Sequence, residues 1–194
     1  MKVNHNTAER ILDIAQELIQ RRGYNAISFT DIADGVGIKK PSIVHHYPSK
    51  AALGKAVVKR YRETFASALN SIANDPEKTA FEAFDFYCTP YLDYGKTRDM
   101  VCLCGALAGE FTALPKSVQK EVSQFFEAHI SWLQMILERG KNSGEFRFSE
   151  ASHAMAMHIL DSLQGALIVK RATGNFEHLD KTIELLKEKL CVVG

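Results

Sequence analysis

Apolar residues recur at spacings of three and four along most of this 194-residue chain. In residues 7–22, one face of a helix would carry Ile11, Ile14, Ala15, Leu18 and Ile19. This period is that of an amphipathic α-helix, and no segment shows the strict alternation of a half-buried strand. The chain is therefore predicted to be all-α, with about nine helices.

Glycine and capping residues divide the first part of the chain into short helices. A first helix is predicted over 7–22, and Gly23 follows it as a stop signal. Thr30 is expected to cap a second, short helix over 31–35, because a threonine oxygen can accept a hydrogen bond from a free amide of the first turn.

A tight turn and a third helix should follow. Gly35 and Gly37 are expected to allow the turn, and a third helix is predicted over 41–46 with Pro41 in its first turn. Pro48 and Ser49 then stop this helix and cap a fourth one.

This arrangement of short helices is typical of a helix-turn-helix, whose later helix enters the major groove of DNA. Ile38 and Ile43 are expected to pack inward. The outer surface then carries side chains that can contact DNA: Lys39, Lys40, Ser42, Val44, His45 and His46. The two histidines are not expected to bind a metal, because neighbouring helical positions point about 100° apart and no third ligand lies at a useful spacing.

Longer helices are predicted beyond this region, separated by turn and breaker residues. Their ranges are 50–73, 78–94, 99–113, 116–141, 150–173 and 176–190. We therefore expect two domains, one over residues 5–65 with the helix-turn-helix at about 28–47, and one over 66–194.

The net charge of +1 hides an uneven distribution of charged residues. Residues 1–60 contain ten Lys and Arg against five Asp and Glu, whereas residues 61–194 contain fourteen against eighteen. A basic N-terminal part favours contact with a polyanion such as nucleic acid. No apolar run reaches the roughly 20 residues of a membrane span, and Met1 to Asn6 lack the regions of a signal peptide, so a cytoplasmic protein is predicted.

These N-terminal motifs resemble the DNA-binding domain of the TetR/AcrR family of bacterial transcriptional regulators. The resemblance covers residues 7–60 and is carried by several segments: Arg10-Ile11-Leu12-Asp13, Arg22-Gly23-Tyr24, Thr30-Asp31-Ile32-Ala33, Lys39 to Tyr47, and Pro48-Ser49-Lys50 with Leu53. It implies that the turn and the third helix read an operator.

The resemblance also implies roles for individual residues. An aromatic residue that ends the third helix and a lysine that opens the fourth should bind phosphate, and these are Tyr47 and Lys50. Thr30 is a further phosphate candidate because a helix N-terminus offers free amides. Val44 departs from the family, which usually has tyrosine there; valine can touch a thymine methyl but cannot donate a hydrogen bond.

Four cysteines, too few and too unevenly spaced for a disulfide framework, are expected to be reduced: Cys88, Cys102, Cys104 and Cys191. Cys102 lies near the start of a predicted helix and follows Lys96 and Arg98, so it is either a reactive thiolate or a small buried hydrophobe. Residues 101–108 are similar to a cysteine-bearing stretch in family branches that include electrophile- and oxidant-sensing repressors. Cys104 would point away from Cys102 on a helix, whereas tertiary packing could bring Cys88 closer.

Aromatic and apolar residues on two predicted helices either line an effector pocket or form plain core. They are Phe81, Phe84, Tyr87, Cys88 and Tyr91 on one helix and Phe125, Phe126, Trp132, Met135 and Ile136 on another. An effector pocket as such is implied by the resemblance, not by this spacing.

The last two predicted helices favour self-association. The helix over 150–173 is apolar on more than one face, so one face should pack inward and another against a second copy of the chain. Together with the helix over 176–190, and with the same two helices of the second copy, it would form a four-helix interface like that of the family. Ser162, Gly165 and Ala166 would let the helices approach closely.

The sequence therefore predicts a homodimeric transcriptional regulator, more a repressor than an activator, that binds a near-palindromic operator. A small-molecule effector or thiol modification would release the regulator from the operator by favouring a different spacing of the two DNA-binding domains of the dimer. No cofactor is expected. The alternatives are a redox or ligand sensor that acts through protein contacts and an all-α enzyme, although the chain has no G-x-S-x-G elbow, phosphate-binding loop or H-E-x-x-H pair.

Overall fold

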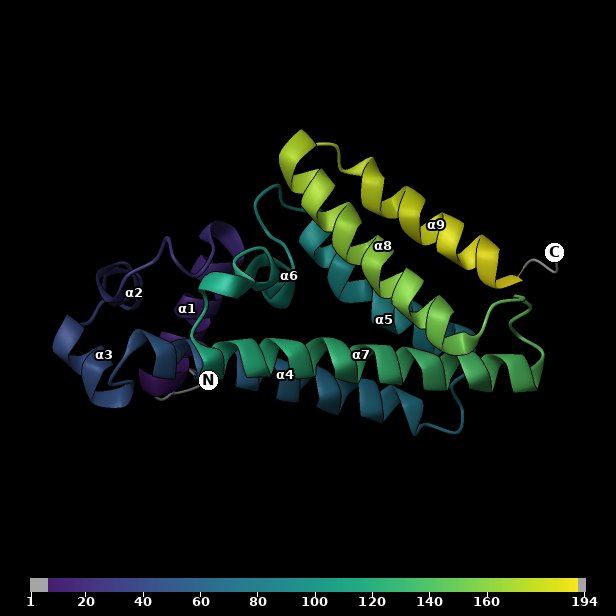
Figure 1. The fold of residues 1–194 in the computed structure, drawn as a ribbon, viewed down its shortest axis with the longest axis horizontal. Coiled ribbons are helices and arrows are strands. Elements are labelled where there is room, and N and C mark those ends of the chain that lie inside the picture. Colours follow the sequence, from purple (N-terminus) through teal and green to yellow (C-terminus); the bar gives the residue numbers. More distant parts are fainter. Residues whose placement is uncertain (1–6, 192–194) are drawn as a thin grey trace, which may run out of the picture. The chain divides into compact units, whose positions relative to one another are not determined.

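The computed structural model describes residues 7–191, and this part of the chain is helical without strands, as the sequence predicted (Figure 1). None of these helices is long and apolar enough to cross a membrane. The helices, with one short 3₁₀ segment η1, are α1 (Thr7–Arg22), α2 (Phe29–Val36), α3 (Lys40–His46), α4 (Lys50–Ala73), α5 (Ala80–Gly95), α6 (Leu103–Ala108), η1 (Phe111–Ala113), α7 (Lys116–Ser143), α8 (Ser152–Thr173) and α9 (Glu177–Cys191).

The described residues form two compact units. The first, here the head unit, combines those of Met1–Glu63 with Leu103–Gln124; the second, the body unit, combines Thr64–Cys102 with those of Phe125–Gly194. The head unit thus includes α6 and the start of α7 as well as the N-terminal helices. The predicted domain division after residue 65 stays a prediction. The outer ends of the predicted domains, residues 5 and 194, lie outside the described residues. So does the segment from Met1 to Asn6, which was predicted not to be a signal peptide.

The helix ends of the head unit follow local chemistry, with one correction. Gly23 ends α1 as predicted, with φ +87° and its amide donating to the Ile19 carbonyl at 2.8 Å. The prediction that Thr30 caps the second helix is wrong, because Ser28 is the cap. The Ser28 hydroxyl accepts from the Asp31 amide, and the Asp31 carboxylate accepts from the Ser28 amide at 2.7 Å. This reciprocal pair satisfies two amides at once, which Thr30 inside the first turn cannot do.

The two glycines of the predicted turn have different roles. Gly37 ends α2 with φ +76°, and its amide donates to the Ala33 carbonyl at 2.9 Å. Gly35 instead lies inside α2, contrary to the prediction. A Cβ at Gly35 would lie 2.7 Å from Cγ2 of Ile14, so this glycine lets α1 and α2 approach closely. The predicted cap of α4 is confirmed, because the Ser49 hydroxyl accepts from the Ala52 amide at 3.1 Å.

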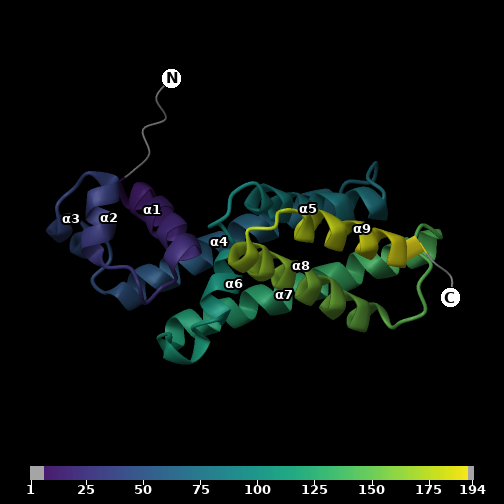
Figure 2. The same ribbon diagram turned by 90° about the horizontal axis from the view of Figure 1, so that it is seen from above.

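In the body unit, α8 and α9 lie side by side and α5 packs against both (Figures 1 and 2). Apolar side chains from these helices and from α7 form the core, among them Phe84, Leu133, Ile159, Leu163, Leu167 and Ile183. Lys170 of α8 is also fully buried, and its ammonium donates to the carbonyl oxygens of Tyr94, Thr97 and Met100.

The long helix predicted over 99–113 is wrong. Only α6 and η1 form there, and residues 97–102 have no helical structure. The carbonyl oxygens of this stretch are turned to α8, where Lys170 binds those of Thr97 and Met100 and Arg171 binds that of Asp99. Carbonyl groups engaged by another helix are not aligned to accept from amides of their own segment.

Candidate DNA-binding surface and sensor cluster

The short α3 divides into a buried and an exposed face, as predicted. Its Ile43 is fully buried, and Ile38 in the preceding turn is half-buried. The predicted outer residues are all exposed: Lys39, Lys40, Ser42, Val44, His45 and His46. Because α3 starts directly after the extended cap residue Lys39, the two lysines and Ser42 occupy its N-terminal end, where helix-turn-helix proteins contact bases.

The two predicted phosphate contacts are already engaged by the protein. The Tyr47 hydroxyl donates to the Ala8 carbonyl at 3.4 Å, and burial raises the pKa of Tyr47. The Lys50 ammonium lies 4.7 Å from the centre of the Tyr24 ring and 3.5 Å from the Asn25 carbonyl. Desolvation lowers the pKa of Lys50, although the nearby carboxylates of Glu110 and Asp31 oppose this effect. Thr30 is exposed in the first turn of α2.

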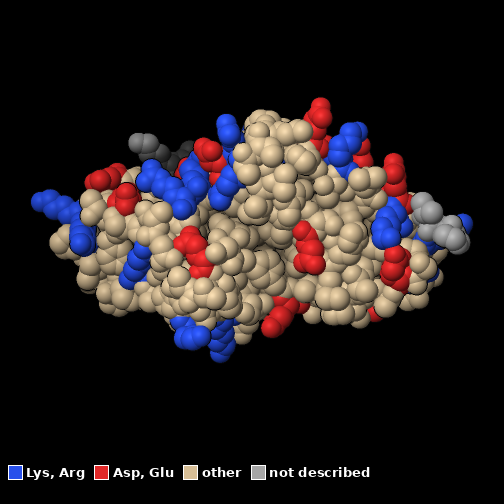
Figure 3. All heavy atoms as spheres, turned by 45° about the horizontal axis from the view of Figure 1, so that its top comes forward, with Lys and Arg blue, Asp and Glu red and all other residues tan. Residues whose placement is uncertain are grey.

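Charge is distributed unevenly over the surface. In Figure 3, Lys and Arg side chains gather toward the end where the N-terminal helices lie, and Asp and Glu are more frequent elsewhere on that face. Some basic groups of the head unit nevertheless pair within the protein, since Arg60 contacts Glu9 at 2.9 Å and Asp13 at 2.7 Å. The basic surface left for a polyanion is therefore smaller than the residue count suggests.

Four of the eight predicted sensor residues, Tyr87, Tyr91, Phe125 and Trp132, meet inside the body unit and, together with His129, are here called the aromatic cluster. The ring of Tyr87 stacks on that of Trp132 at a centroid distance of 5.5 Å and an interplanar angle of 14°. The ring of Phe125 lies 3.9 Å from that of His129. Phe84 is also fully buried in the body unit.

Polar groups of this cluster are paired within the protein. Gln164 of α8 donates to the Tyr91 hydroxyl at 3.1 Å, the Tyr91 ring lies 5.8 Å from that of Tyr87, and the Tyr87 hydroxyl lies 3.1 Å from Nδ1 of His129. Desolvation lowers the pKa of His129 to about 4, so the ring is neutral near pH 7 and its Nδ1 can accept from Tyr87. Neither His129 nor Gln164 was among the residues predicted from the sequence. The spacing of His129 with Phe125 and Trp132 on one helical face was the available signal.

Three of the four cysteines are buried. Cys102 is 2% exposed and directly precedes α6, and Cys104, in the head unit, is fully buried. Burial raises the pKa of Cys88 to about 12, which disfavours its thiolate. Only Cys191 is exposed among the four, all of which lie in the described part of the chain as free thiols. Within residues 7–191, no three His, Cys, Asp or Glu side chains converge as metal ligands.

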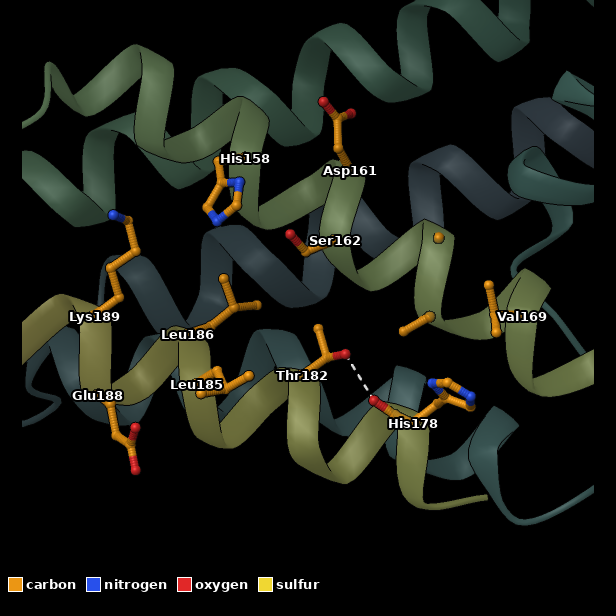
Figure 4. A pocket seen from close by; sticks show the side chains of 12 residues that line it. His158, Asp161, Ser162, Val169, His178, Thr182, Leu185, Leu186, Glu188 and Lys189 are labelled. Carbon is orange, nitrogen blue, oxygen red and sulfur yellow. Dashed lines mark hydrogen bonds between the residues drawn. The ribbon is translucent and has the colours of Figure 1, made fainter. Parts of the chain in front are cut away.

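A groove of about 760 Å³ lies between α8 and α9. Gly165 of α8 opens onto it, since an added Cβ would meet no atom within 4 Å. The labelled side chains that line the groove are His158, Asp161, Ser162 and Val169 from α8 and His178, Thr182, Leu185, Leu186, Glu188 and Lys189 from α9 (Figure 4). Leu185 is 64% exposed and Val169 is 42% exposed, so much of the surface here is apolar.

Comparison with known proteins agrees with this architecture. Residues 11–57 match the family model described as bacterial regulatory proteins, tetR family, and residues 80–186 match that of the tetracyclin repressor-like C-terminal domain. A TetR transcriptional regulator from Legionella pneumophila is 34% identical, with a TM-score of 0.87 over 98% of this chain and 100% of that one. The chain belongs to the TetR family.

Other TetR-family relatives have names that state a regulatory role. The HTH-type transcriptional repressor DhaR from Mycobacterium sp. strain GP1 is 24% identical over 94% of this chain and 91% of that protein. The reduced form of Escherichia coli NemR shares the fold, with 20% identity and a TM-score of 0.81 over 96% of this chain and 98% of that one. As a TetR-family member, the protein is a DNA-binding transcriptional regulator rather than an enzyme, and dimerisation and release by an effector are typical of its family.

Proposed function

We propose that this regulator is a homodimeric repressor in the cytoplasm that binds a near-palindromic operator and leaves it when an effector binds the body unit. The observation that carries the proposal is α3, which buries Ile43 and exposes polar and basic side chains on the opposite face. We also keep the division into a DNA-binding domain over 5–65 and an effector-binding and dimerisation domain over 66–194 as part of the proposal.

The contacts with DNA are divided by chemistry. Lys40 and Ser42 meet base edges or adjacent phosphates, and Val44 packs against a thymine methyl. Phosphates are bound by Lys50 and by Tyr47, whose hydroxyl exchanges the Ala8 carbonyl for a phosphate oxygen. Four further exposed residues are assigned to the backbone of the DNA: Thr30, Lys39, His45 and His46.

A second copy of the chain occupies the groove between α8 and α9. The exposed apolar side chains Val169 and Leu185 favour an apolar partner, and Gly165 leaves room for a close approach of backbones. Leu185→Glu would place a charge in this interface and should convert the dimer to a monomer in sedimentation. Leu92→Glu is the matched control, because Leu92 is 37% exposed on α5 outside the groove.

The effector binds at the aromatic cluster and changes the spacing of the two heads. Tyr87, Tyr91 and Gln164 offer hydroxyl and amide groups in an apolar setting, which suits a small, largely apolar ligand with one or two polar groups. Thiol modification of Cys102 is the second candidate trigger. Its position beside the cluster favours it, since the thiol is close enough to influence the pKa of Tyr87 and Tyr91, whereas its burial favours a packing role.

The test measures operator binding by fluorescence anisotropy with DNA from the promoter of the protein's own gene and of neighbouring genes. Alanine at Lys40 and Lys50 should weaken binding and reduce its salt dependence by about one unit of slope each. Lys78→Ala is the control, because Lys78 pairs with Glu82 in the body unit. Unchanged affinity in both head variants would refute the assigned surface.

A thiol-reactive electrophile, applied to the wild type and to Cys102→Ser, separates the two triggers. Loss of binding only in the protein that keeps Cys102 would make the regulator a thiol switch. Retained binding in both proteins would leave a reversible ligand as the trigger. An added ligand that binds equally tightly with and without operator would rule itself out as the effector, because coupling between two sites must be reciprocal.

A further inference from the structure

One carboxylate of the head unit binds the loop between α1 and α2. Glu110 lies between α6 and η1, and its side chain accepts three hydrogen bonds from residues more than eighty positions earlier in the chain. Oε1 accepts from the Tyr24 amide at 2.9 Å, and Oε2 accepts from the Asn25 amide at 2.9 Å and from its Nδ2 at 2.6 Å. Bonds to an ionised acceptor are stronger than those between neutral groups, so this contact fixes the loop firmly.

The loop is shaped to receive this side chain. Gly23 has φ +87°, and a Cβ there would lie 2.0 Å from Oε1 of Glu110. Glycine is therefore needed at residue 23 both for the backbone conformation and for the space that the carboxylate occupies. After α1 ends, the amides of Tyr24 and Asn25 have no helical partners, and Glu110 satisfies both.

The bound loop in turn supports Lys50. The Tyr24 ring is 4% exposed, and Gly54 of α4 lets it pack closely, since a Cβ at Gly54 would lie 2.7 Å from Cε2 of Tyr24. The Lys50 ammonium lies 4.7 Å above this ring and also reaches the Asn25 carbonyl. The two residues whose amides bind Glu110 are therefore the two that hold Lys50.

We infer that Glu110 is a positioning residue for DNA binding: by fixing the α1–α2 loop it directs Lys50 toward the phosphate backbone. The inference rests on the proposed role of Lys50 as a phosphate contact. If Glu110 acted only through its charge, removing it should tighten DNA binding, because a carboxylate near DNA repels phosphate. A loss of affinity on removing Glu110 is thus a signature of positioning.

The experiment is a double-mutant cycle on DNA affinity with Glu110→Ala, Lys50→Ala and the double variant. The probes are a labelled promoter duplex and a random-sequence duplex at low salt. We expect Glu110→Ala to weaken binding by about five- to tenfold in the wild type but by less than about twofold when Lys50 is already alanine. Glu110→Gln keeps the shape and one acceptor atom, so it should fold even if alanine does not, and should weaken binding by an intermediate factor.

Two further measurements separate positioning from stability and from charge. Glu127→Ala, at an exposed glutamate of α7 in the body unit, removes the same charge and should not weaken binding. Amide hydrogen exchange of Tyr24 and Asn25 should become faster in Glu110→Gln at a temperature where the protein stays folded.

The results that would overturn this inference differ from those that would overturn the proposed function. Three results would overturn the positioning role of Glu110 and leave the DNA-binding proposal intact. They are additive losses of DNA affinity in the double variant, unchanged affinity in Glu110→Ala, and tighter binding in Glu110→Ala. Failure of the wild type to bind either duplex would overturn the proposed function, and this inference with it.

Discussion

The buried His129 should make the protein lose stability in mildly acidic solution. Its ring is 5% exposed, contacts Phe125, and pairs with the Tyr87 hydroxyl, and burial lowers its pKa to about 4 from an ordinary value near 6.5. The unfolded chain therefore takes up a proton at a higher pH than the folded protein does. The stabilising effect of a neutral His129 is complete above about pH 7 and is lost progressively as the pH falls from 6.5 toward 4.

The size of this effect follows from the difference between the two pKa values. Each unit corresponds to about 1.4 kcal/mol, so the full loss approaches about 3 kcal/mol, and the part between pH 7 and pH 5 is about 2 kcal/mol. Most carboxylates titrate below this window, so histidines dominate it. A loss of this size is a large fraction of the stability of an ordinary domain.

The assay is urea unfolding followed by tryptophan fluorescence at fixed protein concentration, at pH 7 and pH 5. His129→Asn keeps an acceptor for Tyr87 but does not titrate, so it should start less stable at pH 7 and then lose about 2 kcal/mol less than the wild type on acidification. His153→Asn, at an exposed histidine, is the control and should follow the wild type. An equal loss in the wild type and in His129→Asn would refute the reasoning.

Four other substitutions test the packing and the caps by thermal or urea unfolding. Ser28→Ala should cost about 1 kcal/mol, because it removes the α2 cap, whereas Thr30→Ala should change little; the reverse order would restore Thr30 as the cap. Lys170→Met should cost at least about 2 kcal/mol, because it removes the buried ammonium that donates to three part-buried carbonyl groups, and a neutral effect would contradict this. Gly54→Ala should cost about 1–3 kcal/mol, because its methyl would lie 2.7 Å from the Tyr24 ring; a gain in stability would show that the ring can move aside.

Glu110, His129 and Lys170 show why several important contacts could not be read from the sequence. Each acts on partners more than forty residues away, and its own neighbours along the chain carry no sign of the pairing. His129 is one polar residue on an apolar face of α7 and was not among the predicted site residues. Its hydrogen bond to Tyr87 depends on how α5 and α7 pack, which no local pattern encodes.

The sequence by itself determined the all-α class, the ends of α1 and α4, and the division of α3 into a buried and an exposed face. These features depend on interactions within a few residues, namely the helical period, the left-handed glycine at Gly23 and the Ser49 cap. Only the tertiary structure decided where the predicted helix over 99–113 breaks. Side chains of α8 bind the carbonyl groups of Asp99 and Met100 at the start of that segment, and this long-range competition overrides the local helical preference there.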